Sequence, residues 1–458
     1  MSKSWKCECK WEQKKQQHPQ LRLFVHQRFP VHHPFLGLSP VAERHILEAV
    51  QEGTLFGLIQ CDIEVPEPLR GHFEELPPIF KNTEVSRADI GDFMRHYAES
   101  IVSCPSPDGL LSAVTLEKKK KKNILLTTPL LQWYLWHGLH VTYIQQIVEY
   151  RPKRCFQAFG DTVCMARRQG DQDPSKAILA DTFKLLGNSA YGKTLTNLAK
   201  HCHVRYVDDK GTQNLINEPL FRKLTPLTEE VTEVESAKAT INWNLPLQIG
   251  FFVYQYAKLR MLQFYYDFVD QFMSRSGYQL CEMDTDSLYM ALSTPTLEQA
   301  VHPTLLPRFY KEYHHWFPSQ ACDVHQADFA STRLAKQPWT PPSCCLQHQK
   351  FEKRTPGLLK VEFESEGIVA LCSKTYYCFG NTTDKLSCKG LNKRLKDLTK
   401  DHYLKVLKTQ TSGCGLNRGF RTDGKTMYTY QQTRDSLFFF CPKRKVKDDG
   451  VSTKPLDI

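Results

Sequence analysis

One stretch of the sequence combines residue types that could bind a nucleotide. It reads KLLGNSAYG, from Lys184 to Gly192. If it forms a helix, Lys184, Asn188 and Tyr191 share one face, because positions i, i+4 and i+7 lie on the same side. That face would offer a cation for phosphate oxygens, an amide, and an aromatic ring beside a base. A helix with one exposed lysine and an Asn–Gly end would have the same residues, so the segment alone is only moderately specific.

A second stretch, Asp284-Thr285-Asp286-Ser287, could bind a divalent cation. Two short apolar runs flank it between Tyr278 and Leu292, and this pattern predicts a β-hairpin with the acids at its tip. Carboxylates at i and i+2 of a strand face the same side, so both can reach one ion. Mg²⁺ is commonly held by one or two carboxylates together with substrate phosphates. An ordinary acidic β-turn would also have these four residues.

The elements that must position these stretches can be predicted from periodicity and breakers, and together they indicate an α+β fold. The acidic turn at 170–175 separates two amphipathic segments and predicts a helical hairpin. The aromatic stripe of the longest amphipathic segment is typical of a core helix rather than of a ligand site. The predicted strands are Leu55–Val65, Val141–Tyr150 and those within Val361–Cys378, and the predicted helices are Pro129–His137, Phe156–Arg168, Ala177–Tyr191 and Leu247–Met273.

Composition restricts the class of protein. A chain of 458 residues allows two to four structural units, and 41% hydrophobic residues supply a sizeable core. The net charge of +11 favours a polyanionic partner. The 16 cysteines are scattered, which is typical of reduced thiols in an intracellular protein. The charged start resembles no signal peptide, and no window is apolar enough for a transmembrane helix, so no membrane partner is expected.

The two stretches occur in an order that resembles motifs B and C of family B DNA polymerases. Ser373-Lys374-Thr375-Tyr376-Tyr377 follows and resembles the K-x-Y element of the protein-primed branch. Further similarity runs through KRTPGLLKVE and through LSCKGLNKR, which contains Lys389. The resemblance covers Leu55 to the C-terminus. It is strongest to organellar and viral enzymes and to those of self-synthesising, Maverick/Polinton-type DNA transposons.

The resemblance implies a palm with an antiparallel sheet, helical-hairpin fingers and a C-terminal thumb. The exonuclease domain of the family is expected to be missing. The implied divisions are a divergent or truncated leader (1–53), the N-terminal palm (54–150), the fingers (151–205), the palm with motif C (206–294), and the thumb with the C-terminal region (295–458).

The implied activity is template-directed DNA synthesis by a two-metal mechanism, in which a primer 3′-hydroxyl attacks a dNTP with Mg²⁺ or Mn²⁺ as cofactor. Partners would be primer–template DNA and a terminal protein primer, in the nucleus or wherever the element replicates.

Asp286 and Asp284 would be the catalytic, metal-binding acids. The residues that would bind the nucleotide are Lys184, Asn188, Tyr191 and Gly192. The residues that would contact the DNA are Lys374, Tyr376 and Lys389. Additional phosphate contacts would come from Arg167, Arg168 or Lys176.

The sequence departs from the family at motif A, because D-x-x-S-L-Y-P does not occur in it. A two-metal mechanism needs a second carboxylate, and the best substitute is Asp62, in the predicted strand Leu55–Val65. A truncated transposon- or virus-derived polymerase is therefore the main hypothesis. One alternative is a catalytically inactive DNA- and nucleotide-binding remnant. The other is a metal-dependent nuclease that uses Asp62 and Glu64.

A separate set of residues has the types of a zinc site. Cys322-x-x-His325 and Cys345-x-x-His348 could form a Cys₂His₂ site. The alternative is a pair of structural cysteines with two exposed histidines in a proline-rich loop.

Overall fold

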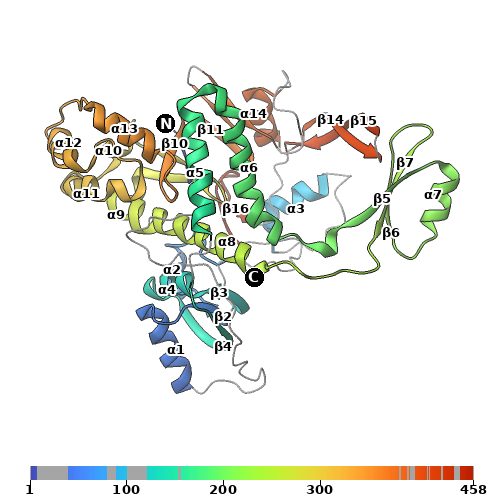
Figure 1. Ribbon diagram of the computed structural model, residues 1–458, viewed down its shortest axis with the longest axis horizontal. Helices are drawn as coiled ribbons and strands as arrows, with labels where there is room; N and C mark the ends of the chain where they lie inside the picture. The colour runs from blue at the N-terminus through green and yellow to red at the C-terminus, as the bar shows by residue number, and fades with distance from the viewer. Residues whose placement is uncertain are drawn as a thin grey trace.

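The computed structural model has mixed helices and small antiparallel sheets, which confirms the α+β class (Figure 1). Two hydrophobic cores hold these elements together. The structure describes residues 2–7, 40–79, 89–100, 121–152, 156–380, 383–388, 391, 398–409, 411, 413–423, 426–437 and 444–456.

The sheet that contains the acidic hairpin has four antiparallel strands in the order β10-β1-β9-β8. The predicted hairpin is confirmed, because Asp284 ends β8 and Ser287 begins β9. The N-terminal strand β1 lies between β9 and β10, which no sequence pattern predicted. The strands are β1 (Ser2–Cys7), β8 (Tyr278–Asp284), β9 (Ser287–Leu292) and β10 (Leu359–Ser365).

A second sheet, of order β3-β2-β4, forms a lobe at the bottom of Figure 1 with helices α1, α2 and α4. Alternate residues of its central strand β2 point into the core, and Ile59, Cys61 and Ile63 are fully buried. Gly138, with φ of 78°, follows the end of α4 in the left-handed conformation typical of a helix C-terminus. The elements are α1 (Pro40–Glu52), β2 (Gly57–Glu64), α2 (Glu67–Arg70), β3 (Lys121–Thr127), α4 (Thr128–Trp136) and β4 (His140–Glu149).

The predicted helical hairpin is present as α5 (Gln157–Gln172) and α6 (Ala177–Thr194), which pack on each other. Asp173 caps the connecting 3₁₀ turn η1 (Pro174–Lys176) by accepting the Ser175 N–H. A further 3₁₀ turn, η2 (Leu198–Lys200), follows α6.

After η2 the chain forms an arm that extends to the right in Figure 1. It is a separate sheet of order β5-β7-β6 with one helix, and it begins in the range 151–205 that the resemblance assigned to the fingers and continues into the range 206–294 assigned to the palm. The arm consists of β5 (Cys202–Val207), α7 (Asp209–Ile216), β6 (Phe221–Pro226) and β7 (Thr232–Ala237).

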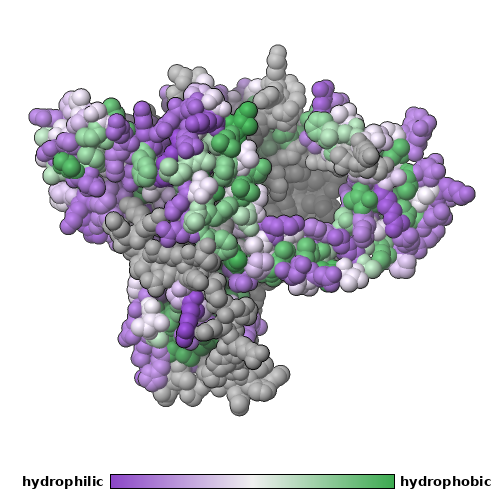
Figure 2. Space-filling model, in the orientation of Figure 1, coloured by the Kyte–Doolittle hydropathy of each residue, from purple (hydrophilic) through white to green (hydrophobic). Residues whose placement is uncertain are grey.

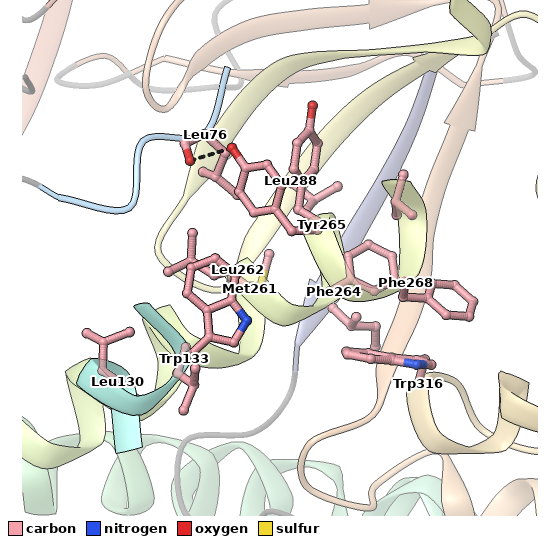
Figure 3. Close-up of a cluster of buried hydrophobic side chains, with 14 of the residues drawn as sticks. Leu76, Leu130, Trp133, Met261, Leu262, Phe264, Tyr265, Phe268, Leu288 and Trp316 are labelled. Carbon is pink, nitrogen blue, oxygen red and sulfur yellow. Dashed lines mark hydrogen bonds between the residues drawn. The ribbon is translucent and has the colours of Figure 1, made fainter. Parts of the chain in front are cut away.

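The long aromatic segment forms α8 (Leu247–Leu262), a π-helix η3 (Gln263–Val269) and α9 (Asp270–Phe272), and its predicted role as core is confirmed. Figure 3 shows Phe264 and Phe268 of this segment close to Trp316, with Trp133 on another side. The rings of Phe268 and Trp316 are 5.3 Å apart. The segment is therefore enclosed by neighbouring elements rather than lying on the surface.

A group of short helices follows β9 and packs on the same core. Phe309 and Phe329 of this group are buried. The elements are α10 (Leu297–Ala300), η5 (Pro303–Leu305), α11 (Leu306–Trp316), η6 (Asp323–His325), α12 (Gln326–Leu334) and α13 (Ser343–Glu352).

The second core joins the C-terminal elements to a helix from the range 54–150. Met94 of that helix, α3, is buried with Tyr403 and Leu456. The elements are α3 (Gly91–Ser100), β11 (Gly367–Cys372), β12 (Thr375–Phe379), β13 (Lys385–Ser387), α14 (Lys400–Thr409), β14 (Gly413–Asp423), β15 (Thr426–Ser436), β16 (Arg444–Val446) and β17 (Thr453–Pro455).

We predict that Phe268→Ala lowers the free energy of unfolding by about 3–5 kcal/mol, because truncating a fully buried ring leaves a cavity. The matched control is Phe420→Ala, since Phe420 lies on β14 with 68% of its surface exposed. The control should change stability by less than about 0.5 kcal/mol. Urea unfolding measures both, and equal effects would show that the η3 core does not stabilise the fold.

Candidate active site

The two acids of the predicted motif C lie at a two-residue turn between β8 and β9. Thr285 adopts φ of 52°, a left-handed conformation that is strained for a β-branched residue. The Thr285 hydroxyl donates to Asp284 Oδ1 over 3.2 Å, and the Ser287 hydroxyl donates to the Asp284 carbonyl over 3.3 Å. These contacts hold the turn and the Asp284 carboxylate.

The Lys374 turn between β11 and β12 contacts this hairpin directly. Lys374 Nζ lies 3.3 Å from Asp284 Oδ2, and its backbone N–H donates to Glu282 Oε1 over 3.1 Å. The Ser373 hydroxyl donates to the Met283 carbonyl over 3.4 Å. Lys374 has φ of 68°, so it too sits in a tight, strained turn. The structure therefore brings together two predicted site segments that are far apart in the sequence.

Tyr376 extends the contact along β12. Its hydroxyl accepts a hydrogen bond from the Tyr289 hydroxyl, and the two rings are 4.5 Å apart. Burial raises the pKa of Tyr376, and Lys385 Nζ lies 5.5 Å from the centre of the Tyr289 ring. Lys374 and Tyr376 thus project from one rigid loop and strand beside the acids. Lys389, the third predicted DNA contact, lies outside the described residues.

Glu282 is a site residue that the sequence analysis missed. It lies two positions before Asp284 on β8 and is only 7% exposed. Burial, together with the nearby Asp284, raises the pKa of Glu282 to about 7, and the hydrogen bond from Lys374 N–H partly opposes this shift. No hydrogen bond reaches Oε2 from the part of the chain that the structure describes. The alternation of acids in E-M-D-T-D was the signal that could have identified it.

The predicted nucleotide-binding face of α6 is only partly formed. Lys184 and Asn188 are exposed, as predicted. Tyr191 is 4% exposed and meets the ring of Tyr254 edge-on at 6.2 Å, so it is not presented with the other two. At Gly192, an added Cβ would have no neighbour within 4 Å, so the surface there is open.

Exposed apolar side chains lie next to Lys184 on the same helix. Leu185 is 68% exposed and Leu186 is 48% exposed. Figure 2 shows apolar surface along this helical hairpin. These two leucines lie at i+1 and i+2 from Lys184, so they expose apolar surface on other sides of the helix than the Lys184–Asn188 face.

Of the three additional cations proposed for phosphate contact, Arg168 has an internal role. Its guanidinium lies 3.7 Å from the centre of the Phe351 ring and donates to the Phe351 carbonyl over 3.1 Å. Lys176 pairs with Asp173 over 3.8 Å. Arg168 therefore fastens α5 to α13 and is not a free phosphate ligand.

Asp62, the proposed third metal ligand, belongs to the other sheet. Its Oδ1 accepts the Asn123 N–H over 2.9 Å and a hydrogen bond from the Gln145 amide. Among the described residues, no group of three or more potential ligands includes Asp62, Asp284 or Asp286. Asp62 and the hairpin acids therefore lie in different sheets, and the Asp62 ligand assignment and the nuclease pair of Asp62 with Glu64 stay predictions.

The strand next to the hairpin in the sheet is β1 instead. Lys6 of β1 is opposite Ser287, and Ser4 is opposite Tyr289. The sequence of β1, SKSWKC, contains no acid. The neighbouring strand therefore supplies no second carboxylate.

Three of the four predicted zinc ligands come together, and a different residue takes the place of the fourth. Cys322, His325 and Cys345 form a group, but its fourth member is Cys344 rather than the predicted His348. Cys344 and Cys345 both lie in the first turn of α13, whereas His348 lies one turn further along.

No known family model, no characterised protein and no solved structure matches this chain. Within the described residues, no helix is both long and apolar enough to cross a membrane.

We predict that Glu282→Gln removes a pH dependence of stability. A carboxyl whose pKa rises from 4.5 to about 7 on folding keeps its proton while the unfolded chain ionises. The wild type should therefore lose stability relative to the variant as the pH rises from 4.5 to 7, by on the order of 3 kcal/mol.

Urea unfolding at intervals across this range measures the difference between the two proteins. Glu52→Gln, on the exposed end of α1, is the control and should follow the wild type at every pH. A constant difference between wild type and Glu282→Gln from pH 4.5 to 7 would contradict the assigned role of Glu282.

Proposed function

We propose that this chain is a family B DNA polymerase-type protein of the protein-primed branch, and that it binds primer–template DNA and a nucleotide at the β8–β9 hairpin. The single observation that carries the proposal is the contact of Lys374 with Asp284 and Glu282. The resemblance assigns Lys374 to the primer strand and Asp284 to the metal site. In a polymerase these two functions must be adjacent, because the primer end reacts beside the metal ion.

The side chains at the turn fit a hard divalent ion. Asp284 and Asp286 offer carboxylate oxygens, which Mg²⁺ and Mn²⁺ prefer. The Asp284 side chain is about one-third exposed, so a ligand can approach it. When bound there with a dNTP, the ion would neutralise phosphate charge and polarise the α-phosphate.

The remaining residues of the proposal act on the substrates directly. Lys184 and Asn188 are accessible on α6 and would contact the nucleotide phosphates and the nascent base pair. The open surface at Gly192 leaves room for a base, and Tyr191 supports this helix from behind through Tyr254. Lys374 and Tyr376 would hold the primer strand, with Lys374 donating to a backbone phosphate.

Under this proposal the chain binds the substrates of the family but catalyses nucleotide transfer poorly. Two-metal transfer needs a further carboxylate that bridges both ions. Strand β1 supplies none, and Asp62 is hydrogen-bonded in another sheet. The hairpin can therefore bind a nucleotide with one ion, while extension of a primer is weak. A terminal protein as primer, and replication wherever the element resides, remain part of the proposal by resemblance.

We predict that the chain binds primer–template DNA with an affinity that falls steeply as salt rises, because phosphate contacts dominate such binding. Lys374→Ala should weaken binding roughly tenfold, the loss expected for one charge-assisted contact. It should also reduce the slope of log K against log salt by about one. Fluorescence anisotropy with a labelled primer–template measures both quantities.

The matched control is Lys311→Ala, which removes the same charge from the exposed surface of α11. It should leave both affinity and salt slope nearly unchanged. If the two variants lose equal affinity, the Lys374 turn is not a DNA contact. If the wild type binds a blunt duplex of equal length as tightly, recognition of a primer end is excluded.

A further inference from the structure

Four side chains with soft or borderline ligand atoms converge beside the η6 turn. Cys322 precedes this turn and His325 ends it, while Cys344 and Cys345 begin α13. The three Sγ atoms and His325 Nδ1 all lie within 4.8 Å of one another. These residues are outside the hairpin site, and the proposed function does not use them.

The separations of these atoms fit a tetrahedron around one ion. Cys322 Sγ is 3.6 Å from Cys345 Sγ and 3.8 Å from Cys344 Sγ. His325 Nδ1 is 3.2 Å from Cys322 Sγ and 3.6 Å from each of the other two sulfurs. Zinc with Zn–S of about 2.3 Å and Zn–N of about 2.0 Å places its ligands about 3.8 Å apart for S–S and about 3.5 Å for S–N.

A disulfide explains this arrangement less well. Its sulfurs would be about 2.05 Å apart, whereas the sulfur distances from Cys322 exceed 3.5 Å, and all three cysteines are free thiols. Three thiols and an imidazole directed at one point are a typical structural zinc donor set, and thiolates select zinc over hard ions such as Mg²⁺. The two candidate metal sites in this chain thus differ in chemistry.

We propose that Cys322, His325, Cys344 and Cys345 bind one structural Zn²⁺ ion. Four protein ligands close the coordination sphere and leave no position for a substrate, so the ion stabilises rather than catalyses. It joins the loop before α12 to the start of α13 across the proline-rich segment between them.

The surroundings support a site that is built rather than accidental. Cys345 is fully buried in the main core, which fixes one ligand. The Cys322 N–H points at Cys345 Sγ over 3.4 Å, a contact that favours the thiolate which a metal requires. The Trp339 indole N–H donates to the Gln320 carbonyl over 3.3 Å and holds the proline-rich segment against the Cys322 loop.

Metal content of the full-length chain tests the proposal first. After expression with added zinc, elemental analysis should find about one zinc per chain, and Cys322→Ser should abolish it. His348→Ala is the matched control, because His348 belongs to the predicted Cys₂His₂ set but not to the observed group; it should retain the full zinc content. Folded protein that contains no zinc after expression with added zinc would overturn the proposal.

The variants Cys322→Ser and Cys345→Ser could fail to fold. A second measurement, titration of the zinc-free chain with Co²⁺, therefore uses a variant of an exposed ligand. Cys344 is exposed, so Cys344→Ser should fold. Wild type and His348→Ala should show the intense visible bands of tetrahedral, thiolate-bound cobalt. Cys344→Ser should bind Co²⁺ at least roughly a hundredfold more weakly, as expected for the loss of a direct ligand. Loss of binding in His348→Ala with none in Cys344→Ser would overturn this ligand set.

Discussion

The aromatic side chains of η3 are enclosed from several directions, and the position of the candidate site depends on that enclosure. Trp133 of α4, Trp316 of α11 and Leu288 of β9 all lie around this segment (Figure 3). Leu288 and Met290 are fully buried, so the hairpin is anchored by its apolar face. The carboxylates at its tip are therefore held by packing that begins far from the turn, as a preorganised site requires.

The π-helical widening of this segment also connects the lobes. Tyr265 and Tyr266 are adjacent and both buried, and their hydroxyls donate to Glu75 and to the Leu76 carbonyl. Arg275 donates to the Tyr265 hydroxyl over 2.7 Å and thereby adds a charge to the same network. Such local widening is frequent at functional sites. Here it joins the loop that follows α2 to strand β8, because Glu75 also accepts the Leu280 N–H over 3.3 Å.

Three acidic residues gather near the tip of the β8–β9 hairpin. Glu282, Asp284 and Asp286 lie within five residues, and Lys374 is the cation that pairs with Asp284. Burial and the neighbouring acid already hold the pKa of Glu282 near 7. A divalent ion bound at the turn would offset the negative charge of Asp284 and Asp286, whose carboxylate oxygens are the ligands that Mg²⁺ prefers.

Local patterns predicted the local elements well. The hairpin of Asp284 and Asp286, the α5–α6 pair and the buried α8 segment all follow from periodicity and turn residues, which act over short distances. Strand β1 could not be predicted, because its place between β9 and β10 depends on long-range pairing. Cys344 could not be predicted as a zinc ligand either, because the usual spacing rules favour His348. Only the position of the start of α13 beside η6 shows that Cys344 reaches Cys322, His325 and Cys345.

The most direct test of the account is primer extension by the full chain with Mg²⁺ or Mn²⁺, at DNA concentrations where binding is saturated. Losing a metal-bridging carboxylate should remove several kcal/mol of transition-state stabilisation, or on the order of a thousandfold in rate. We expect little or no extension despite full DNA binding. Robust synthesis that disappears both in Asp286→Ala and in Asp62→Ala would contradict it, and would show that Asp62 reaches the hairpin during catalysis.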